Sequence, residues 1–197
     1  MKRREPLPKA SLETLHRAFE LVGQRFGTNT ACVEAAVMLQ GIAKHLGYDL
    51  KLRPVSVGVN DTVSGGSICM GRKIWASLTP EQHETLQGNA LSDDDNLGHV
   101  VLTLDEPALL MDPNLRQVNP RGINVPNLFV PIEDADPDPE DGQWVVNGKG
   151  FEVHYILDAG ANPLLENIDE YRAIEEGDYQ RIAKALRHGL AVELAPA

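Results

Sequence analysis

Three residues of this chain carry side chains that can act together as a nucleophile, a base and an orienting carboxylate: Cys32, His99 and Asp112. Cys32 stands at the start of a segment with helical periodicity, where unpaired backbone N–H groups and the helix dipole stabilise a thiolate. A thiolate in this position is a good nucleophile. We therefore expect Cys32 to attack an acyl carbon, while its own N–H donates one hydrogen bond to the oxyanion that forms.

Two apolar segments, 96–104 and 108–112, lie on either side of a short polar turn and predict a β-hairpin. If the turn is centred on residues 105–106, His99 and Asp112 are directly opposed. Side chains in such pairs have Cβ atoms roughly 4.5 to 5.5 Å apart, so Asp112 can accept a hydrogen bond from the His99 ring. A carboxylate so placed fixes the imidazole tautomer and stabilises the imidazolium. The hairpin therefore predicts an oriented histidine base.

Further residues are candidates for binding the substrate. Gln24 and Asn29 precede Cys32 and carry amides that can donate the second hydrogen bond to an oxyanion. Trp75 and Trp144 are candidates for lining a substrate cleft, with core packing as the alternative for either ring. We expect the substrate site to lie around the start of the Cys32 helix.

Together these residues resemble the core of the transglutaminase-like branch of the papain-like cysteine enzymes. The resemblance rests on Cys32 opening a helix that continues Val-Glu-Ala-Ala-Val-Met-Leu, on the strand Gly-His99-Val-Val-Leu, and on Met-Asp112-Pro at the end of the next strand. It covers about residues 28–113. It implies that Cys32 is the nucleophile, His99 the general base and acid, and Asp112 the orienting carboxylate. It also implies a helix packed on an antiparallel sheet.

We therefore expect a cysteine-dependent acyl-transfer enzyme, either an amide or ester hydrolase, a protease or a transglutaminase-like enzyme. Its substrate would be a protein, a peptide or a small amide or ester, and the chemistry needs no cofactor. Two alternatives remain open. One is a non-catalytic member of the same fold that acts as a binding or adaptor module. The other is an acyltransferase like the arylamine N-acetyltransferases, which the Cys-x-Glu spacing of Cys32 and Glu34 also resembles.

Each candidate also has a purely structural interpretation. Cys32 can be a small core residue on an alanine-rich helix, and the histidine and aspartate can be a pair that only supports the sheet. His154 is the rival base, but Asp158 lies roughly 13 Å further along the same strand and is too distant to orient it. Cys69, in a short apolar run, is expected to be a buried bystander.

The periodicity of apolar residues predicts the elements that position these side chains. The expected helices cover 11–22, 31–46, about 162–174 and a segment from Asp178, and the expected strands cover 50–59, 68–70, 96–104, 108–112 and 151–157. Ser11, Thr30 and Asp178 are the expected N-caps of three helices. Pro54 predicts a bulge or an edge position early in its strand. The acidic run 133–141 has no apolar content to bury and predicts an exposed loop.

Helices followed by strands and then by helices predict an α+β fold with a mainly antiparallel sheet. In this arrangement the helix that carries Cys32 is one of the N-terminal helices and packs on the sheet. Further helices follow at the C-terminus. We expect one domain over 1–197, with a core of about 28–160 and a C-terminal helical extension over 161–197.

Composition restricts the partners. The 29 acidic and 18 basic residues give a net charge of −11, which disfavours nucleic acid. The basic start of the chain is not followed by an apolar segment, so we expect a cytoplasmic protein that does not bind membranes. Two cysteines are too few for a disulfide framework or a thiolate zinc site, and the histidines lack metal-ligand spacing. We therefore expect at least one free thiol and no metal site.

Overall fold

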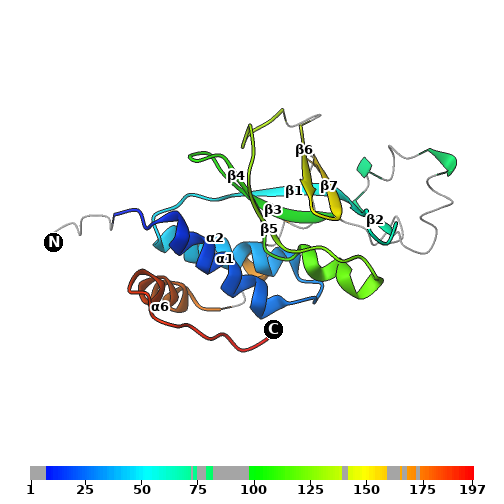
Figure 1. Cartoon of the computed structure of the whole chain (residues 1–197). Coiled ribbons are helices and arrows are strands. Elements are labelled where there is room, and N and C mark those ends of the chain that lie inside the picture. Colours follow the sequence, from blue (N-terminus) through cyan, green and yellow to red (C-terminus); the bar gives the residue numbers. More distant parts are fainter. Residues whose placement is uncertain are drawn as a thin grey trace, which may run out of the picture.

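The computed structural model describes residues 8–71, 73–74, 79–81, 98–138, 142–158, 165, 168–171 and 174–197 (Figure 1). The helices are α1 (Leu12–Phe26), α2 (Cys32–His45) and α6 (Glu176–Arg187), with 3-10 helices η1 (Leu115–Arg121) and η2 (Ile168–Tyr171). The strands are β1 (Lys51–Asp61), β2 (Ser67–Met70), β3 (His99–Leu104), β4 (Leu109–Asp112), β5 (Leu128–Pro131), β6 (Gln143–Gly148) and β7 (Phe151–Leu157). Every strand pairing is antiparallel, so the expected α+β fold is confirmed.

The sheet has the strand order β5-β4-β3-β1-β7-β6, and β2 pairs with β1 off this path. The first half of β1 pairs with β3 and its second half with β2, so these two strands follow each other along one side of β1. On the other side, pairing with β7 begins only at Val55. Pro54 lies at the end of this pairing in a central strand, and its carbonyl oxygen accepts from the Asp158 N–H at 3.0 Å, so the expected bulge or edge position is not found.

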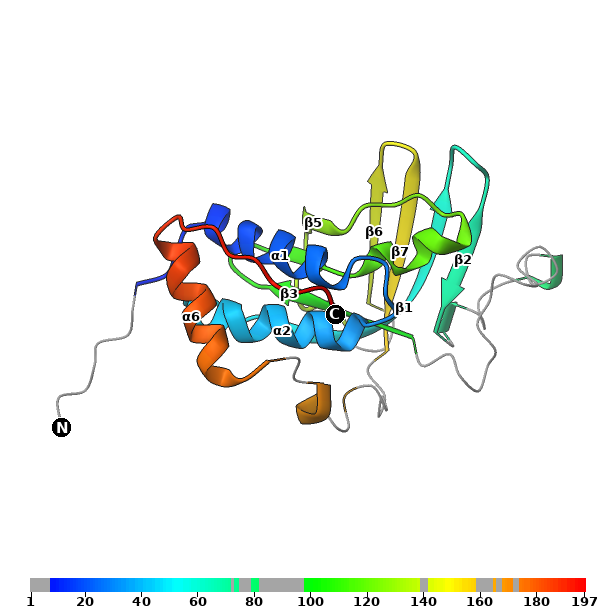
Figure 2. The ribbon, with the colours of Figure 1, turned by 90° about the horizontal axis from the view of Figure 1, so that it is seen from below.

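Helices α1, α2 and α6 lie on one side of the sheet (Figure 2). They pack against side chains that alternate along β3 and β4, including Val100, Leu102 and Met111. The sheet curves, and its opposite face encloses a second core that contains Val101, Leu110 and Tyr155. Successive residues of β3 point to opposite faces of the sheet and therefore belong to different cores. His99 lies on the same face as Val101, the face towards the second core, which we call the inner face.

Helix α2 is buried on most sides, as its many alanines suggest. Its start differs from the prediction, because the N-cap is Ala31 and not Thr30, and the first helical residue is Cys32. Ala31 has φ −149° and ψ 41°, which is not helical. Its N–H binds a side chain from outside the helix, the Oδ1 of Asn114, at 3.2 Å. Cys32 thus occupies the first helical position.

The register of the β3–β4 hairpin also differs from the prediction. Leu104 pairs with Leu109, and Leu102 pairs with Met111. The turn is centred one residue later than expected, so His99 and Asp112 are diagonal neighbours and are not directly opposed. Because the register changes by two residues, every side chain stays on the predicted face. The two candidate residues therefore still share the inner face of the sheet.

Other differences lie towards the C-terminus and in the loops. The periodicity did not predict β5, β6 or η1. The last helix begins at Glu176 with Glu175 as N-cap, so Asp178 lies in the first turn. Most of the helix expected over 162–174 lies outside the described residues. Within this range, Ile168–Tyr171 forms the 3-10 helix η2. In the acidic run, Ala135 is buried and Asp136 pairs with Arg53, so its described part is only partly an exposed loop.

Hydropathy gives a simple result for the described helices. None of them combines the length and the apolar character that a membrane-spanning helix requires.

Candidate active site

A buried histidine and a buried carboxylate form the centre of the candidate site. His99 Nε2 lies 2.8 Å from Asp112 Oδ2, and neither side chain has measurable solvent exposure. Gly98 allows this placement, because its φ is +93° and a Cβ atom at this position would lie only 2.7 Å from the Val55 carbonyl oxygen. The expected contact between His99 and Asp112 is therefore confirmed, although the register that led to it was wrong.

Asp112 accepts hydrogen bonds from two further donors. The Tyr155 hydroxyl donates to Oδ2 at 2.9 Å, across the curved inner face from β7 to β4. The backbone N–H of Asn114 donates to Oδ1 at 3.2 Å. Burial, and then the charge of Asp112 and the hydrogen bond to it, raise the pKa of Tyr155 well above its ordinary value. The Tyr155 hydroxyl therefore stays protonated and donates a charge-assisted hydrogen bond to the Asp112 carboxylate.

The second ring nitrogen of His99 contacts Gln117, which sequence reasoning missed. The amide of Gln117 lies 2.8 Å from His99 Nδ1, and Gln117 comes from η1 and is 8% exposed. A neutral ring with a proton on Nε2 accepts from the Gln117 NH₂ group, whereas an imidazolium requires the amide oxygen in its place. The amide can satisfy either state, so Gln117 orients the ring without fixing its charge.

Cys32 completes the cluster. It is 9% exposed and stands at the first position of α2, where the backbone N–H groups have no acceptor within the helix. Burial lowers the pKa of His99, but the charges of Asp112 and Cys32, and hydrogen bonds to both, more than offset this and raise it to about 10. His99 is therefore a strongly basic imidazole in contact with a carboxylate and a thiol. This arrangement can transfer a proton from sulfur to nitrogen.

The short segment after β4 organises the site. Asp112 binds the histidine, Asn114 binds the N–H that precedes Cys32, and Gln117 binds the second ring nitrogen. Residues of this segment therefore meet both β3 and the start of α2. The sequence signal available for Asn114 is its position after Pro113, which is typical of a turn. Gln117 lies in a mixed polar and apolar segment, 114–121, which gives no such signal.

The described contacts of the other predicted binding residues do not include the candidate site. Gln24 is on the exposed face of α1, where it lines a pocket of about 590 Å³ together with Arg116 and Lys149. Asn29 is exposed, and its amide donates to the Ala197 carbonyl oxygen at 3.1 Å. Trp75 lies outside the described residues. Neither Gln24 nor Asn29 is thus brought to His99 by the described contacts.

The rival candidates have simpler environments. His154 Nε2 lies 2.8 Å from Glu152 Oε1, in a partly exposed pair on β7. Cys69 is a free cysteine packed beside Ile74 and Ile156, and burial raises the pKa of its thiol to about 11. A thiol of this kind is not ionised near neutral pH. Cys69 is buried, as expected.

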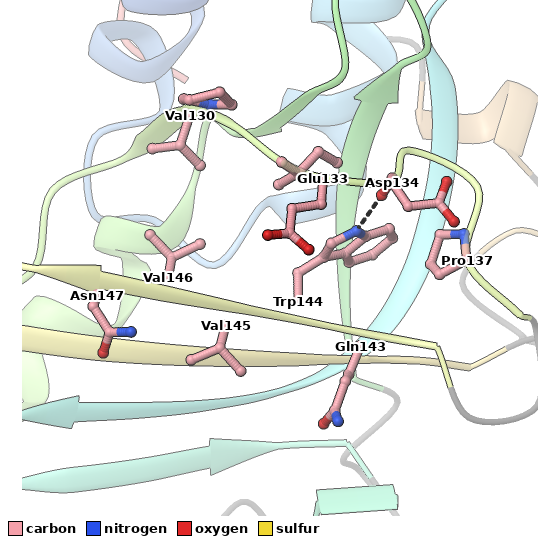
Figure 3. Close-up of a pocket in the computed structure, with 11 residues that line it drawn as sticks. Val130, Glu133, Asp134, Pro137, Gln143, Trp144, Val145, Val146 and Asn147 are labelled. Atoms are coloured by element: carbon pink, nitrogen blue, oxygen red, sulfur yellow. Dashed lines mark hydrogen bonds between the residues drawn. The ribbon is translucent and has the colours of Figure 1, made fainter.

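A separate pocket opens between the two edge strands, β5 and β6 (Figure 3). It has a volume of about 750 Å³, and the indole of Trp144 points into it while donating to the Asp134 carbonyl oxygen at 2.7 Å. Trp144 pairs in register with Tyr155, the residue that binds Asp112. The described residues that line this pocket include no cysteine or histidine. The pocket is therefore not lined by Cys32, His99 or Asp112.

Comparisons with known proteins give no match: no family model, no curated protein and no solved structure is similar to this chain.

Proposed function

We propose that the protein is a cysteine-dependent acyl-transfer enzyme of the papain-like, transglutaminase-like kind. Cys32 is the nucleophile, His99 the general base and acid, and Asp112 the orienting carboxylate. The observation that carries the proposal is the double contact of His99. Its Nε2 is 2.8 Å from Asp112, and Cys32 influences its pKa by charge and by a hydrogen bond.

In the proposed reaction, the Cys32 proton moves to His99 Nδ1, because Asp112 binds Nε2, and the Gln117 amide that contacts Nδ1 gives way to it. The sulfur bonds to the acyl carbon, and the electron pair of the carbonyl moves to its oxygen. When this pair returns, the bond to the leaving group breaks and His99 gives its proton to the leaving amine or alcohol. Water or a second amine then attacks the thioester in the same way, which releases the product and restores Cys32.

The proposed substrates are amides or esters of a protein, a peptide or a small molecule. The net charge of −11 favours neutral or basic ones. A second candidate function, a non-catalytic binding module, is favoured by the closed geometry of the site, because Cys32 is 9% exposed while His99 and Asp112 are fully buried. An acyltransferase that takes its acyl group from a thioester would use the same three residues.

Acylation by p-nitrophenyl acetate tests the proposal. The folded protein is treated with this ester, and the adduct is measured by intact mass and located by peptide mapping. We expect one acetyl group on Cys32 and none on Cys69. The Cys69→Ser variant, as the matched control, should be acylated at the wild-type rate. A folded protein with no adduct on Cys32 would instead support the binding module.

A further inference from the structure

The side chain of Asn114 has a fixed orientation at the start of α2. It is fully buried, and its Oδ1 accepts from the Ala31 N–H at 3.2 Å. A backbone N–H can only donate, so the amide must present its oxygen to Ala31. This contact therefore fixes the position of Nδ2 as well. The backbone N–H of Asn114 is itself held by Asp112 Oδ1, which further restricts the residue.

Asn114 Nδ2 is a buried donor without a hydrogen-bond partner among the described residues. Leaving a buried amide N–H unpaired is unfavourable, and such groups are rare in folded proteins. The unpaired donor belongs to the same amide that binds the residue before Cys32. A ligand with an oxygen acceptor at this place would satisfy it.

The first turn of α2 supplies a second donor at the same place. Cys32 is the first helical residue, so its N–H has no acceptor one turn earlier in the helix. This N–H and Asn114 Nδ2 are both neutral donors held by the fold, because the Asn114 amide binds the N–H of Ala31, the residue that directly precedes Cys32. Charge that develops on an oxygen next to an attacked acyl carbon is stabilised by donors of this kind.

We infer that Asn114 Nδ2 and the Cys32 N–H form the oxyanion hole of the enzyme, an inference that rests on the proposed function. When sulfur bonds to the acyl carbon, the carbonyl electron pair moves to oxygen, and the oxyanion accepts from both donors. Asn114 Nδ2 gains its partner only in this state, so the bond favours the transition state over the free enzyme. Asn114 thus takes the role that the sequence suggested for Gln24 or Asn29.

The Asn114→Asp variant isolates the donor. A carboxylate oxygen can still accept from Ala31 N–H, while the NH₂ group is replaced by an oxygen that repels an oxyanion. We expect acylation of Cys32 by p-nitrophenyl acetate to slow by about 100-fold or more. Alkylation of Cys32 by iodoacetamide displaces iodide from a saturated carbon and forms no oxyanion. The alkylation rate is compared in the neutral Asn114→Ser variant, which adds no charge beside the thiolate, and it should change there by less than about threefold.

Two further variants complete the experiment. The matched control is Asn127→Asp. In the wild-type protein, Asn127 Oδ1 also accepts a hydrogen bond from a backbone N–H, that of Arg116, at 3.0 Å. The Asn127→Asp variant should be acylated at the wild-type rate. Asn114→Ser is the second test variant in case the buried carboxylate prevents folding. Its hydroxyl is small and can accept from Ala31, but it places no amide donor at the site.

The outcomes separate the inference from the proposed function. If the wild-type protein is not acylated at Cys32, both are overturned. If the wild-type is acylated and the folded Asn114 variants react equally fast, the proposed function stands and the role of Asn114 is overturned. A parallel loss of acylation and alkylation would also overturn it, because Asn114 would then act on the nucleophile and not on the oxyanion.

Discussion

The two cysteines are buried to a similar degree but in chemically different surroundings. Cys32 is 9% exposed and Cys69 is 5% exposed. Around Cys69 the neighbours are Ile74 and Ile156, and burial raises the pKa of the thiol to about 11. Cys32 instead opens a helix and contacts His99, whose pKa is raised to about 10. Burial alone therefore does not decide whether a thiol can react, since the polar groups beside it do.

The same contrast separates the two histidine and carboxylate pairs. His99 and Asp112 are fully buried and connected to Tyr155, whereas His154 and Glu152 form a partly exposed pair on β7. An exposed pair of this kind contributes little to stability and is solvated in either charge state. The buried pair must keep its hydrogen bonds, so it can hold a proton in a defined place.

Replacement of each thiol in turn gives the largest expected difference between the two regions. We expect Cys32→Ser to reduce ester acylation by at least about a thousandfold, because a hydroxyl is a far weaker nucleophile than a thiolate. Cys69→Ser should retain the wild-type rate. Stopped-flow release of p-nitrophenol measures both. Equal rates in the two variants would remove the distinction between the cysteines.

Replacement of the carboxylates tests the two histidine pairs. Asp112→Asn removes the charge that orients His99, and we expect acylation to slow by a factor of about a hundred to ten thousand. The matched variant Glu152→Gln removes the carboxylate beside His154 and should change the rate by less than about twofold. Circular dichroism checks that both variants are folded. Wild-type activity in the Asp112→Asn variant would show that the buried pair of His99 and Asp112 has only a structural role.

The raised pKa of His99 predicts how stability depends on pH. In the Cys32→Ser variant the thiol no longer contributes, so Asp112 alone raises the pKa of His99 against the effect of burial, and the rise is smaller than in the intact site. The unfolded histidine loses its proton near pH 6.5. The stability due to His99 is therefore complete below about pH 6.5 and is lost as the pH rises towards the folded-state pKa, which is about 10 in the intact site.

Urea unfolding at several pH values measures this loss. We expect a slope of up to about 1.4 kcal/mol per pH unit, the value for one proton, over that window. Adding Asp112→Asn should flatten the curve. If the free energy of unfolding of the Cys32→Ser variant does not change between pH 6.5 and 9, the pKa of His99 is not raised in the folded chain.

The smallest expected effect concerns the orientation of the imidazole. Gln117→Ala removes the hydrogen bond to Nδ1 and leaves the contact with Asp112. We expect acylation to slow by about tenfold, in line with the loss of one hydrogen bond of about 1 to 1.5 kcal/mol. A faster reaction would indicate instead that Gln117 competes with Cys32 for the ring nitrogen.

The contact between His99 and Asp112 could be predicted from the sequence because every second residue of a strand lies on the same face. The true hairpin turn is centred one residue later, so the register differs by two and the shared face is preserved. A difference of one residue would have sent one of the two side chains into the helical core. The start of α2 was predicted to within one residue, which was enough to place Cys32 in its first turn.

The rest of the site depends on tertiary structure that periodicity does not contain. Asn114 and Gln117 reach the site through the path of η1, a short helix without an apolar repeat. Gln24 and Asn29 are closer to Cys32 in sequence, yet α1 and the following loop direct them to the surface. Proximity along the chain is therefore a poor guide to the residues that surround a helix start.

The reactivity of Cys32 towards iodoacetamide tests the central claim most directly. The two thiols of the native protein are alkylated between pH 6.5 and 8.5, with N-acetylcysteine as the model thiol, and quantified by peptide mass spectrometry. We expect Cys32 to react at pH 6.5 at least about a hundredfold faster than Cys69, and faster than the model thiol. A Cys32 that reacts no faster than N-acetylcysteine at pH 6.5 would contradict a reactive thiolate held by His99.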